Sequence, residues 1–203
     1  MKKITLVSTI LFLLFVNSNF ASAQEAEKLT RVKTFVNDIG NRIVKIAANK
    51  SLSEKAKKDQ IIAEIDIVVD SNWIARFVLG KNYKDFSETQ KTQFQNLYRQ
   101  FMINTYGPKF NNYNGRKFTV LSVEKQKMFY VVKCEFLPVD SNVAISVDFR
   151  VKDKDGKLVI LDFVAEGVSL IESQRSEYDS AISQGGIDKF IKDFSKKVDV
   201  LKK

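Results

Sequence analysis

Residues 143–165 read VAISVDFRVKDKDGKLVILDFVA. Apolar residues occupy every second position from Val143 to Val151, and the residues between them are small or charged. This period of two predicts a strand with one apolar face and one polar face. The tetrapeptide Asp153-Lys154-Asp155-Gly156 predicts a tight hairpin turn. The run after it, Leu158 to Ala165, is apolar on both faces and predicts a strand that is central or covered on both sides.

Two more segments with the same alternation precede this hairpin. Phe118 to Glu124 and Met128 to Leu137 alternate apolar and polar residues and are separated by a short polar turn. Strands that follow one another through short turns pair antiparallel with their neighbours. The sequence therefore predicts a four-stranded antiparallel meander.

Helical periodicity lies on both sides of these strands. Apolar residues at spacings of three and four predict a helix from Glu25 to Ala48 and three shorter helices before the sheet. The pairs Ser51/Glu54 and Ser87/Gln90 have the spacing of capping boxes, and Asp70 or Ser71 can cap the helix between them. Gly107-Pro108 is expected to stop the helix that Ser87 begins. After the sheet, Gly185-Gly186 breaks a helical pattern, and a last amphipathic helix follows.

The order of elements predicts the α+β class: a four-stranded antiparallel meander covered by N- and C-terminal helices. Residues 24–203 are long enough for one domain, and the chain shows no internal repeat or long linker. A sheet covered by helices can enclose an apolar cavity between the two layers. We expect such a cavity here.

The first 23 residues predict a secretory signal peptide. Lys2 and Lys3 precede an uncharged apolar run, Ile4 to Val16, and Ala21-Ser22-Ala23 gives small residues where a signal peptidase reads. The run of about 13 apolar residues is shorter than the roughly 20 of a spanning helix, which disfavours the alternative of a permanent anchor. We expect cleavage after Ala23 and a mature protein, 24–203, that works in the periplasm.

The amino-acid composition limits the kinds of active site that the chain can form and the partners that it can bind. The chain has no histidine and one cysteine, Cys134, which argues against a Ser-His-Asp triad and the usual zinc ligand sets and allows no internal disulfide. Cys134 lies in an alternating apolar segment and is expected to be a buried structural thiol. The formal charge of +9 falls to +7 without the two signal-peptide lysines. Anionic lipid surfaces or acidic proteins are better candidate partners than nucleic acid, and a merely soluble basic surface is the alternative.

Carboxylates at the end of the last predicted strand leave open the possibility that the protein is an enzyme. Asp162 and Glu166 resemble an acid/base pair of an active site. The favoured interpretation is that these carboxylates cap the next segment or pair with Arg175. Asp162 together with Tyr130 would suit a cone-shaped α+β enzyme similar to ketosteroid isomerases. A protein-docking module without a ligand is the third possibility.

Three ordered motifs resemble the MlaC family of periplasmic phospholipid carriers, also called toluene-tolerance auxiliary proteins. The first, similar to the signature D…ARxVLG, is Asp70-Ser71-Asn72-Trp73-Ile74-Ala75-Arg76-Phe77-Val78-Leu79-Gly80. The second, similar to S..Q…F…F…TY, consists of Ser87, Gln90, Phe94, Phe101 and Thr105-Tyr106. The third, similar to D…EGVSL…RSEF, consists of Asp162-Phe163, Glu166-Gly167-Val168-Ser169-Leu170 and Arg175-Ser176-Glu177-Tyr178, with Gly185-Gly186-Ile187 as the closing helix start.

The resemblance implies a carrier with no catalytic step and no cofactor besides its bound phospholipid. It implies transport between an outer-membrane lipoprotein complex and an inner-membrane ABC transporter with its substrate-binding-domain subunit. Such transport maintains outer-membrane lipid asymmetry. The acyl chains are expected between the sheet and the helices, with the headgroup toward solvent.

We assign acyl-chain contacts to apolar residues expected at that interface. They are Ile74, Phe77, Val78, Phe94, Leu97, Phe101, Tyr106, Phe118, Val120, Val132, Phe136, Val147, Phe149, Phe163, Val168 and Leu170. Simple core packing is the alternative for each of them. Arg76 and Arg175 are candidates for contact with a headgroup or a partner, and a local carboxylate, Asp70 in the case of Arg76, is the alternative partner. Gly80 and Gly167 are expected to permit backbone turns.

Overall fold

The computed structural model describes residues 4–111, 115–138, 142–165 and 167–201, with side chains placed at 23–105, 117–137, 142–165 and 167–201. Its α+β architecture confirms the predicted class. A long helix, α1 (Ile4–Ala47), is followed by α2 (Glu54–Val68), α3 (Ser71–Leu79), a 3₁₀ helix η1 (Gly80–Asp85) and α4 (Glu88–Asn111). The sheet comes next, and α5 (Leu170–Val200) ends the chain.

The sheet is an antiparallel meander in sequence order. Its strands are β1 (Gly115–Gln126), β2 (Phe129–Pro138), β3 (Ile145–Lys154), β4 (Lys157–Ala165) and β5 (Val168–Ser169). The described residues thus hold one strand more than predicted, a two-residue strand that pairs with the end of β4. The four longer strands are those that the alternating segments predict.

The hairpin between β3 and β4 confirms the turn predicted from its sequence. Asp155 and Gly156 both have positive φ, 50° and 92°, as a two-residue hairpin turn requires. The Gly156 amide donates a hydrogen bond of 2.8 Å to Asp153 Oδ1, which closes the turn. Residues 158–162 of β4 are buried on both faces, so the apolar run is a strand covered on both sides.

Caps define the helix starts. Asp70 Oδ1 accepts from the Trp73 amide at 2.9 Å and begins α3, as predicted. Ser87 and Gln90 form a reciprocal capping box, with hydrogen bonds of 2.8 and 3.2 Å. The Ser51/Glu54 prediction is wrong by two residues, because Ser53 caps α2 and Glu54 is its first residue. Gly186, at φ 75° and ψ 170°, breaks α5 where the paired glycines predict.

Two helix boundaries differ from the predictions. Helix α1 begins at Ile4, so the predicted signal segment and the predicted first helix form one continuous helix. Helix α4 runs through Gly107-Pro108 to Asn111. Proline removes one backbone donor, and this close to a helix end that loss affects a single carbonyl of the last turns.

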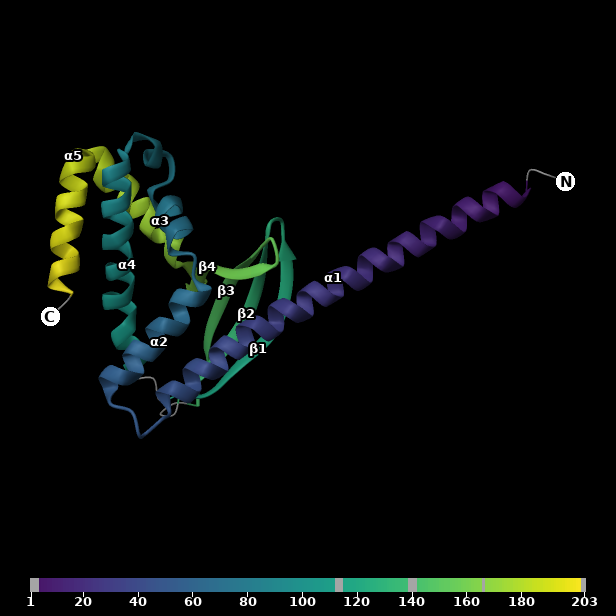
Figure 1. Cartoon of the computed structure of the whole chain (residues 1–203), viewed down its shortest axis with the longest axis horizontal. Helices are drawn as coiled ribbons and strands as arrows, with labels where there is room; N and C mark the ends of the chain where they lie inside the picture. Colours follow the sequence, from purple (N-terminus) through teal and green to yellow (C-terminus); the bar gives the residue numbers. More distant parts are fainter. Residues whose placement is uncertain (1–3, 112–114, 139–141, 166, 202–203) are drawn as a thin grey trace.

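The buried side chains form two separate cores. Figure 1 shows α1 lying along the sheet, while α3, α4 and α5 gather in a bundle beside it. We call the bundle interior the helical core; it includes Ile74, Val78, Phe86, Phe94, Tyr98, Phe101, Tyr178, Phe190 and Phe194. The α1–sheet core includes Val32, Val36, Ile39, Val120, Tyr130, Val132, Cys134, Val151, Leu158 and Ile160. Val69 packs against both, next to the place where the Asp70 amide donates to the Ile160 carbonyl of β4 at 3.4 Å.

Candidate functional site

One face of the sheet collects the apolar residues predicted from the strands. Residues paired across antiparallel strands project to the same face. The register pairs Phe118 with Phe136, and it pairs Phe149 with both Val132 and Phe163. We call this side the apolar sheet face, and its predicted members are Phe118, Val120, Val132, Phe136, Val147, Phe149 and Phe163. The structure therefore brings seven of the predicted acyl-chain residues together.

This face is covered at one end and open at the other. Val132 is fully buried, and Val120 and Val147 are nearly so. Phe163 is 37% exposed and Ile145, which pairs with Phe136, is 40% exposed. Between these ends lies a row of rings in edge contact: Phe118 to Phe149 at 6.3 Å and Phe149 to Phe163 at 5.7 Å between centroids. Ile145 belongs to the site and was missed, although its place in the alternating segment could have identified it.

Helix α1 covers the closed end. Val32, Val36 and Ile39 are buried against the sheet. Gly40 allows α1 to approach the ring of Phe118, because any Cβ at that position would overlap the ring. Two ion pairs hold α1 near the hairpin turns, Lys125 with Glu25 at 2.8 Å and Arg31 with Asp153.

The residues predicted from the helices lie elsewhere. Ile74, Phe77, Val78, Phe94, Leu97 and Phe101 belong to, or pack against, the helical core. Phe94 has aromatic neighbours on α4 and α5, among them Tyr98, Tyr178 and Phe194. These contacts are made within the helical bundle, so the structure does not bring these six residues to the sheet face. Their role toward lipid stays a prediction.

The remaining predicted residues are at the margin. Val168 in β5 pairs with Ala165 and is 62% exposed, so it adds apolar surface to the open end of the sheet face. Leu170, half-buried, is the first residue of α5. The side chain of Tyr106 and the whole of Glu166 lie outside the described residues.

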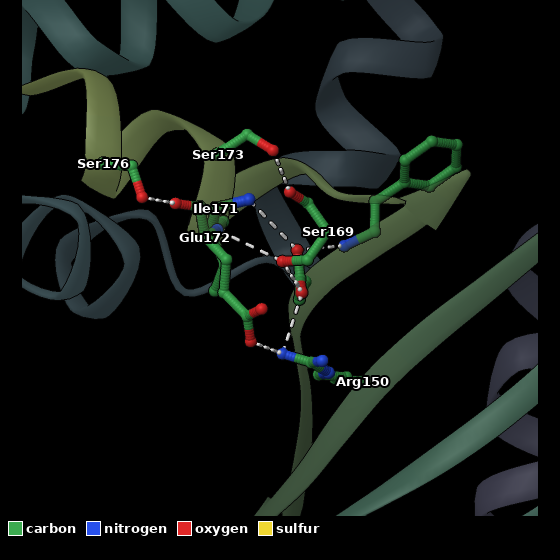
Figure 2. Close-up of polar contacts among 8 residues, drawn as sticks. Arg150, Ser169, Ile171, Glu172, Ser173 and Ser176 are labelled. Atoms are coloured by element: carbon green, nitrogen blue, oxygen red, sulfur yellow. Dashed lines mark hydrogen bonds and ion pairs between the residues drawn. The ribbon is translucent and has the colours of Figure 1, made fainter. Parts of the chain in front are cut away.

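Asp162 anchors the start of α5 on the opposite face of the sheet. Figure 2 shows Arg150, Ser169, Ile171 and Glu172 gathered at this junction. Its carboxylate accepts from Ser169 Oγ at 2.6 Å, from the Phe163 amide at 2.8 Å and from the Ile171 amide at 3.3 Å. Arg150 Nη1 lies 3.3 Å from it and also contacts Glu172 at 2.5 Å. For Asp162 the capping interpretation is thus confirmed, and its ion-pair partner is Arg150 and not Arg175, because the register, which sequence does not show, places Arg150 opposite Asp162. For Glu166 both interpretations stay predictions.

The pKa of the Asp162 carboxyl group lies above its ordinary value, because burial outweighs the hydrogen bonds and the charge around it. Burial raises the pKa of its carboxyl group, and the hydrogen bonds from Ser169, Ile171 and Phe163, with the charge of Arg150, act in the other direction. Phe163, Ser169 and Ile171 belong to the junction between β4 and α5, and Arg150 faces that junction from β3. The residue is therefore built as an anchor for α5.

The predicted pairing of Asp162 with Tyr130 does not form. Tyr130 pairs with Val151, Arg150 pairs with Asp162, and successive residues of β3 point to opposite faces. Tyr130 is buried in the α1–sheet core. The two side chains therefore lie on opposite sides of the sheet and cannot act on one substrate atom.

Cys134 is a buried thiol in the α1–sheet core, as predicted. Burial raises the pKa of this thiol to about 12, with a further contribution from the charge of Asp148. At neutral pH the group is a small apolar side chain and not a nucleophile.

The two arginines contact aromatic rings. The guanidinium of Arg76 lies 5.1 Å from the ring centroid of Tyr83, and that of Arg175 lies 4.8 Å from that of Phe77. Asp70, the alternative partner considered for Arg76, pairs with Lys154 instead. Gly80 and Gly167 have the positive φ values, 54° and 78°, expected of turn glycines.

Two surface hollows lie in the helical half. One, of about 440 Å³, is lined by residues of α4 and α5 such as Gln90 and Lys192. The other, of about 460 Å³, lies inside the bend of α5 and is lined by Phe190, Lys197 and their neighbours. Neither contains a predicted acyl-chain residue, and both have charged rims, so we place the candidate site on the apolar sheet face.

The described ranges contain neither a metal-binding cluster nor a helix that could span a membrane. No group of three or more His, Cys, Asp or Glu side chains there is placed to hold a metal ion. No helix within those same ranges is long and apolar enough to cross a membrane.

Comparisons with known proteins identify the family and support the fold. The family profile described as MlaC protein matches residues 34–196. The intermembrane phospholipid transport system binding protein MlaC of Haemophilus influenzae is 24% identical over 156 residues, which cover 72% of each chain. A phospholipid-binding protein from Ralstonia solanacearum, solved in complex with a phospholipid, shares the fold with a TM-score of 0.70 at 18% identity. That likeness covers 84% of this chain and 98% of the other.

Proposed function

Since this chain belongs to the MlaC family, we propose that it binds a phospholipid on the apolar sheet face and carries it, without a catalytic step. The observation that carries the proposal is the row of Phe118, Phe149 and Phe163, which leads from the α1–sheet core to an exposed apolar end. The related protein from Haemophilus influenzae bears the name of a phospholipid transport protein, and the Ralstonia structure holds a phospholipid. Both support the proposal.

The energetics of lipid transfer explain why such a face is useful. Exposing the acyl chains of a phospholipid, with roughly 30 methylene groups, to water would cost a transfer free energy of about 24 kcal/mol, at ~0.8 kcal/mol per methylene. Free diffusion of the lipid is therefore negligible, and a carrier has to bury the tails. The same magnitude implies that release requires contact with a membrane or a partner.

The tails are proposed to enter at the open end and to extend under α1. Ile145, Phe163 and Val168 provide apolar surface at the entrance. Val120 and Val132 continue that surface beneath the helix. Side chains of α1 fill the closed end, so lipid entry requires α1 to move away from the sheet.

We further propose the route that the family resemblance implies. The signal peptide is cleaved after Ala23, and the mature carrier works in the periplasm. It receives or delivers lipid at an outer-membrane lipoprotein complex and at an inner-membrane ABC transporter through that transporter's substrate-binding-domain subunit. In this role it is an auxiliary component of the transport system that maintains outer-membrane lipid asymmetry.

The test is lipid uptake by delipidated protein from phospholipid vesicles, followed by reisolation and organic extraction. Phe163→Glu places a charge at the entrance, where the exposed position tolerates it, and should reduce uptake at least tenfold because a buried charge beside acyl chains is costly. Met128→Glu is the matched control, since Met128 is 67% exposed at the β1–β2 turn, away from the entrance. Equal lipid uptake by both variants would contradict the placement of the lipid on the apolar sheet face. Absence of uptake by the unaltered protein would contradict the proposed carrier function.

A further inference from the structure

The end of the helical half formed by α3, η1 and the start of α4 is rich in positive charge. Five cationic side chains come together on these elements and on the facing turn of α5: Arg76, Lys81, Lys84, Lys91 and Arg175. Three carboxylates stand among them: Asp85, Glu88 and Asp179. Two of the carboxylates are engaged, Glu88 by Lys91 and Asp179 by Lys81 and Asn82. We call the five cations with the rings of Phe77 and Tyr83 the α3–η1 patch.

Arg76 is an exposed cation held by a ring instead of a carboxylate. Its guanidinium lies 5.1 Å from the Tyr83 ring centroid, and Lys91 Nζ lies 4.7 Å from the same centroid. Within the described part of the chain, Arg76 forms no ion pair. A ring orients a guanidinium without neutralising it, so the positive charge stays available to an outside group.

Arg175 repeats this arrangement on α5, which packs against α3. Its guanidinium lies 4.8 Å from the Phe77 ring centroid, and no ion pair to it exists among the described residues. The close approach depends on Gly80, where a Cβ would lie 2.8 Å from Arg175 Nε. Hydrogen bonds from Asn82 and Lys81 lower the pKa of Asp179, and the charge of Arg175 contributes to that lowering, but the carboxylate is already bound by those two residues.

Aromatic side chains complete the surface. Trp73, the only tryptophan of the chain, stacks on Phe77 with centroids 5.0 Å apart, and Trp73, Phe77 and Tyr83 are all half-buried. Tryptophan and tyrosine beside arginine and lysine are the residues that settle at the headgroup level of a bilayer. We propose that the α3–η1 patch docks the protein on the surface of an anionic lipid bilayer.

A bilayer surface fits these observations better than an acidic protein. The two ring-held guanidiniums are planar forks suited to phosphate oxygens, and they come from two packed elements, α3 and α5, so they offer two separate points of contact to a broad anionic surface. Partly exposed rings between them add affinity for the interfacial region. The patch shares no residue with the apolar sheet face, so this proposal stands apart from the lipid-carrying function.

The test uses Trp73 as a built-in reporter. Purified protein is mixed with vesicles of phosphatidylcholine alone, or of phosphatidylcholine with phosphatidylglycerol, and binding is followed by sedimentation and by tryptophan emission. We expect binding only to the anionic vesicles, a blue shift of the emission, and loss of binding as salt is raised. A preference for neutral vesicles, or sedimentation with no change of Trp73 emission, would overturn the proposal.

Paired variants locate the surface. Arg76→Gln with Arg175→Gln should weaken binding by roughly fivefold for each charge removed. Lys45→Gln with Lys50→Gln is the matched control, because these lysines are at and just after the end of α1 and remove the same charge elsewhere. Equal weakening of vesicle binding by both pairs of substitutions would show a general charge effect and overturn the proposal that the α3–η1 patch is the docking surface.

A single substitution guards against a folding defect in the arginine variant. Lys84 is exposed and forms no ion pair in the described chain, so Lys84→Gln removes one patch charge and leaves the packing intact. It should weaken binding about fivefold by itself. Unchanged binding of Lys84→Gln, or binding of the unaltered protein to an acidic protein but not to vesicles, would also overturn the proposal.

Discussion

Asp162 is the most connected carboxylate at the junction of sheet and helix, and its bonds make a residue-level prediction. Asp162→Asn removes the charge that faces Arg150 and weakens the acceptor for Ser169 and the Ile171 amide. Because the side chain is buried, we expect a loss of about 2–3 kcal/mol in the free energy of unfolding. Denaturant titration measures it. Lipid uptake per folded molecule should stay unchanged.

Asp148→Asn is the control for this experiment. Asp148 lies on the same sheet face, half-buried, and no hydrogen bond to its carboxylate is found in the described structure. We expect a change within about 0.5 kcal/mol. Equal effects of the two substitutions would contradict the anchor role of Asp162.

Asp70 makes a second residue-level prediction, on pH. Partial burial acts to raise the pKa of its carboxyl, but the hydrogen bonds from Lys154 and the Trp73 amide, with the charges of Lys154 and Lys157, outweigh burial and lower it. The native state therefore binds this proton less readily than the unfolded chain. Its stabilisation is present above the ordinary carboxyl pKa and is lost as pH falls through the lower, native value.

Asp70→Asn isolates this effect, because asparagine still caps α3. At neutral pH the variant should be less stable than the unaltered protein by about 1 kcal/mol, and the difference should close from about pH 4 downward. Unfolding curves at a series of pH values measure the difference. A constant gap down to pH 2 would show that the charge of Asp70 is not the source of the stabilisation.

At the scale of elements, α1 is a cover whose hold on the sheet has two parts. Apolar packing of Val32, Val36 and Ile39 provides most of the attraction. The ion pairs of Glu25 with Lys125 and Arg31 with Asp153 are partly exposed, and pairs of this kind contribute at most about 1 kcal/mol each. Such pairs add little stability, yet they tie α1 to the β1–β2 and β3–β4 hairpins.

Breaking both ion pairs should make the cover easier to open. We expect Glu25→Gln with Asp153→Asn to lower stability by no more than about 2 kcal/mol and to speed lipid uptake from vesicles severalfold. Asp59→Asn with Asp193→Asn is the control, since it breaks exposed ion pairs within single helices. Stopped-flow uptake of a fluorescent phospholipid measures the rate. An unchanged rate in the first variant would mean that α1 does not limit entry.

The sequence predicts turns, caps and helix breaks well where the signal involves only a few neighbouring residues. The Asp155-Gly156 turn, the Ser87/Gln90 box and the break at Gly186 all follow from backbone geometry within a few residues. The strand predicted from Val143 begins only at Ile145, and Val143 is 74% exposed, because alternation shows which residues share a face and not where pairing ends. The helical residues around Phe94 show the same limit. Periodicity identifies an apolar side but not the element that covers it.

At the scale of the whole molecule, the division into two cores determines what can open. The helical core is closed by interlocking rings, whereas the α1–sheet core ends in exposed Phe163 and Ile145. No local pattern predicts this division, because it depends on a contact between segments far apart in the sequence. Val69 and Asp70, between α2 and α3, meet Ile160 of β4. The same holds for Asp162 and Arg150, which meet only through strand register.

Cys134 allows this opening to be measured. Its pKa of about 12 and its complete burial predict that alkylation at pH 8 is slower in the native protein than in the unfolded chain by several orders of magnitude. Labelling should proceed only when α1 leaves the sheet, so the Glu25→Gln, Asp153→Asn variant should label faster. Mass spectrometry of the timed reaction measures the rate. Rapid labelling of the unaltered native protein would contradict the described packing.

Native mass spectrometry shows directly whether the molecule carries a phospholipid. The protein is purified without detergent from the cells that naturally produce it, weighed intact and then extracted with organic solvent. We expect an added mass that extracts as phospholipid. A clean lipid-free mass, from protein that also takes up no lipid from vesicles, would contradict the account.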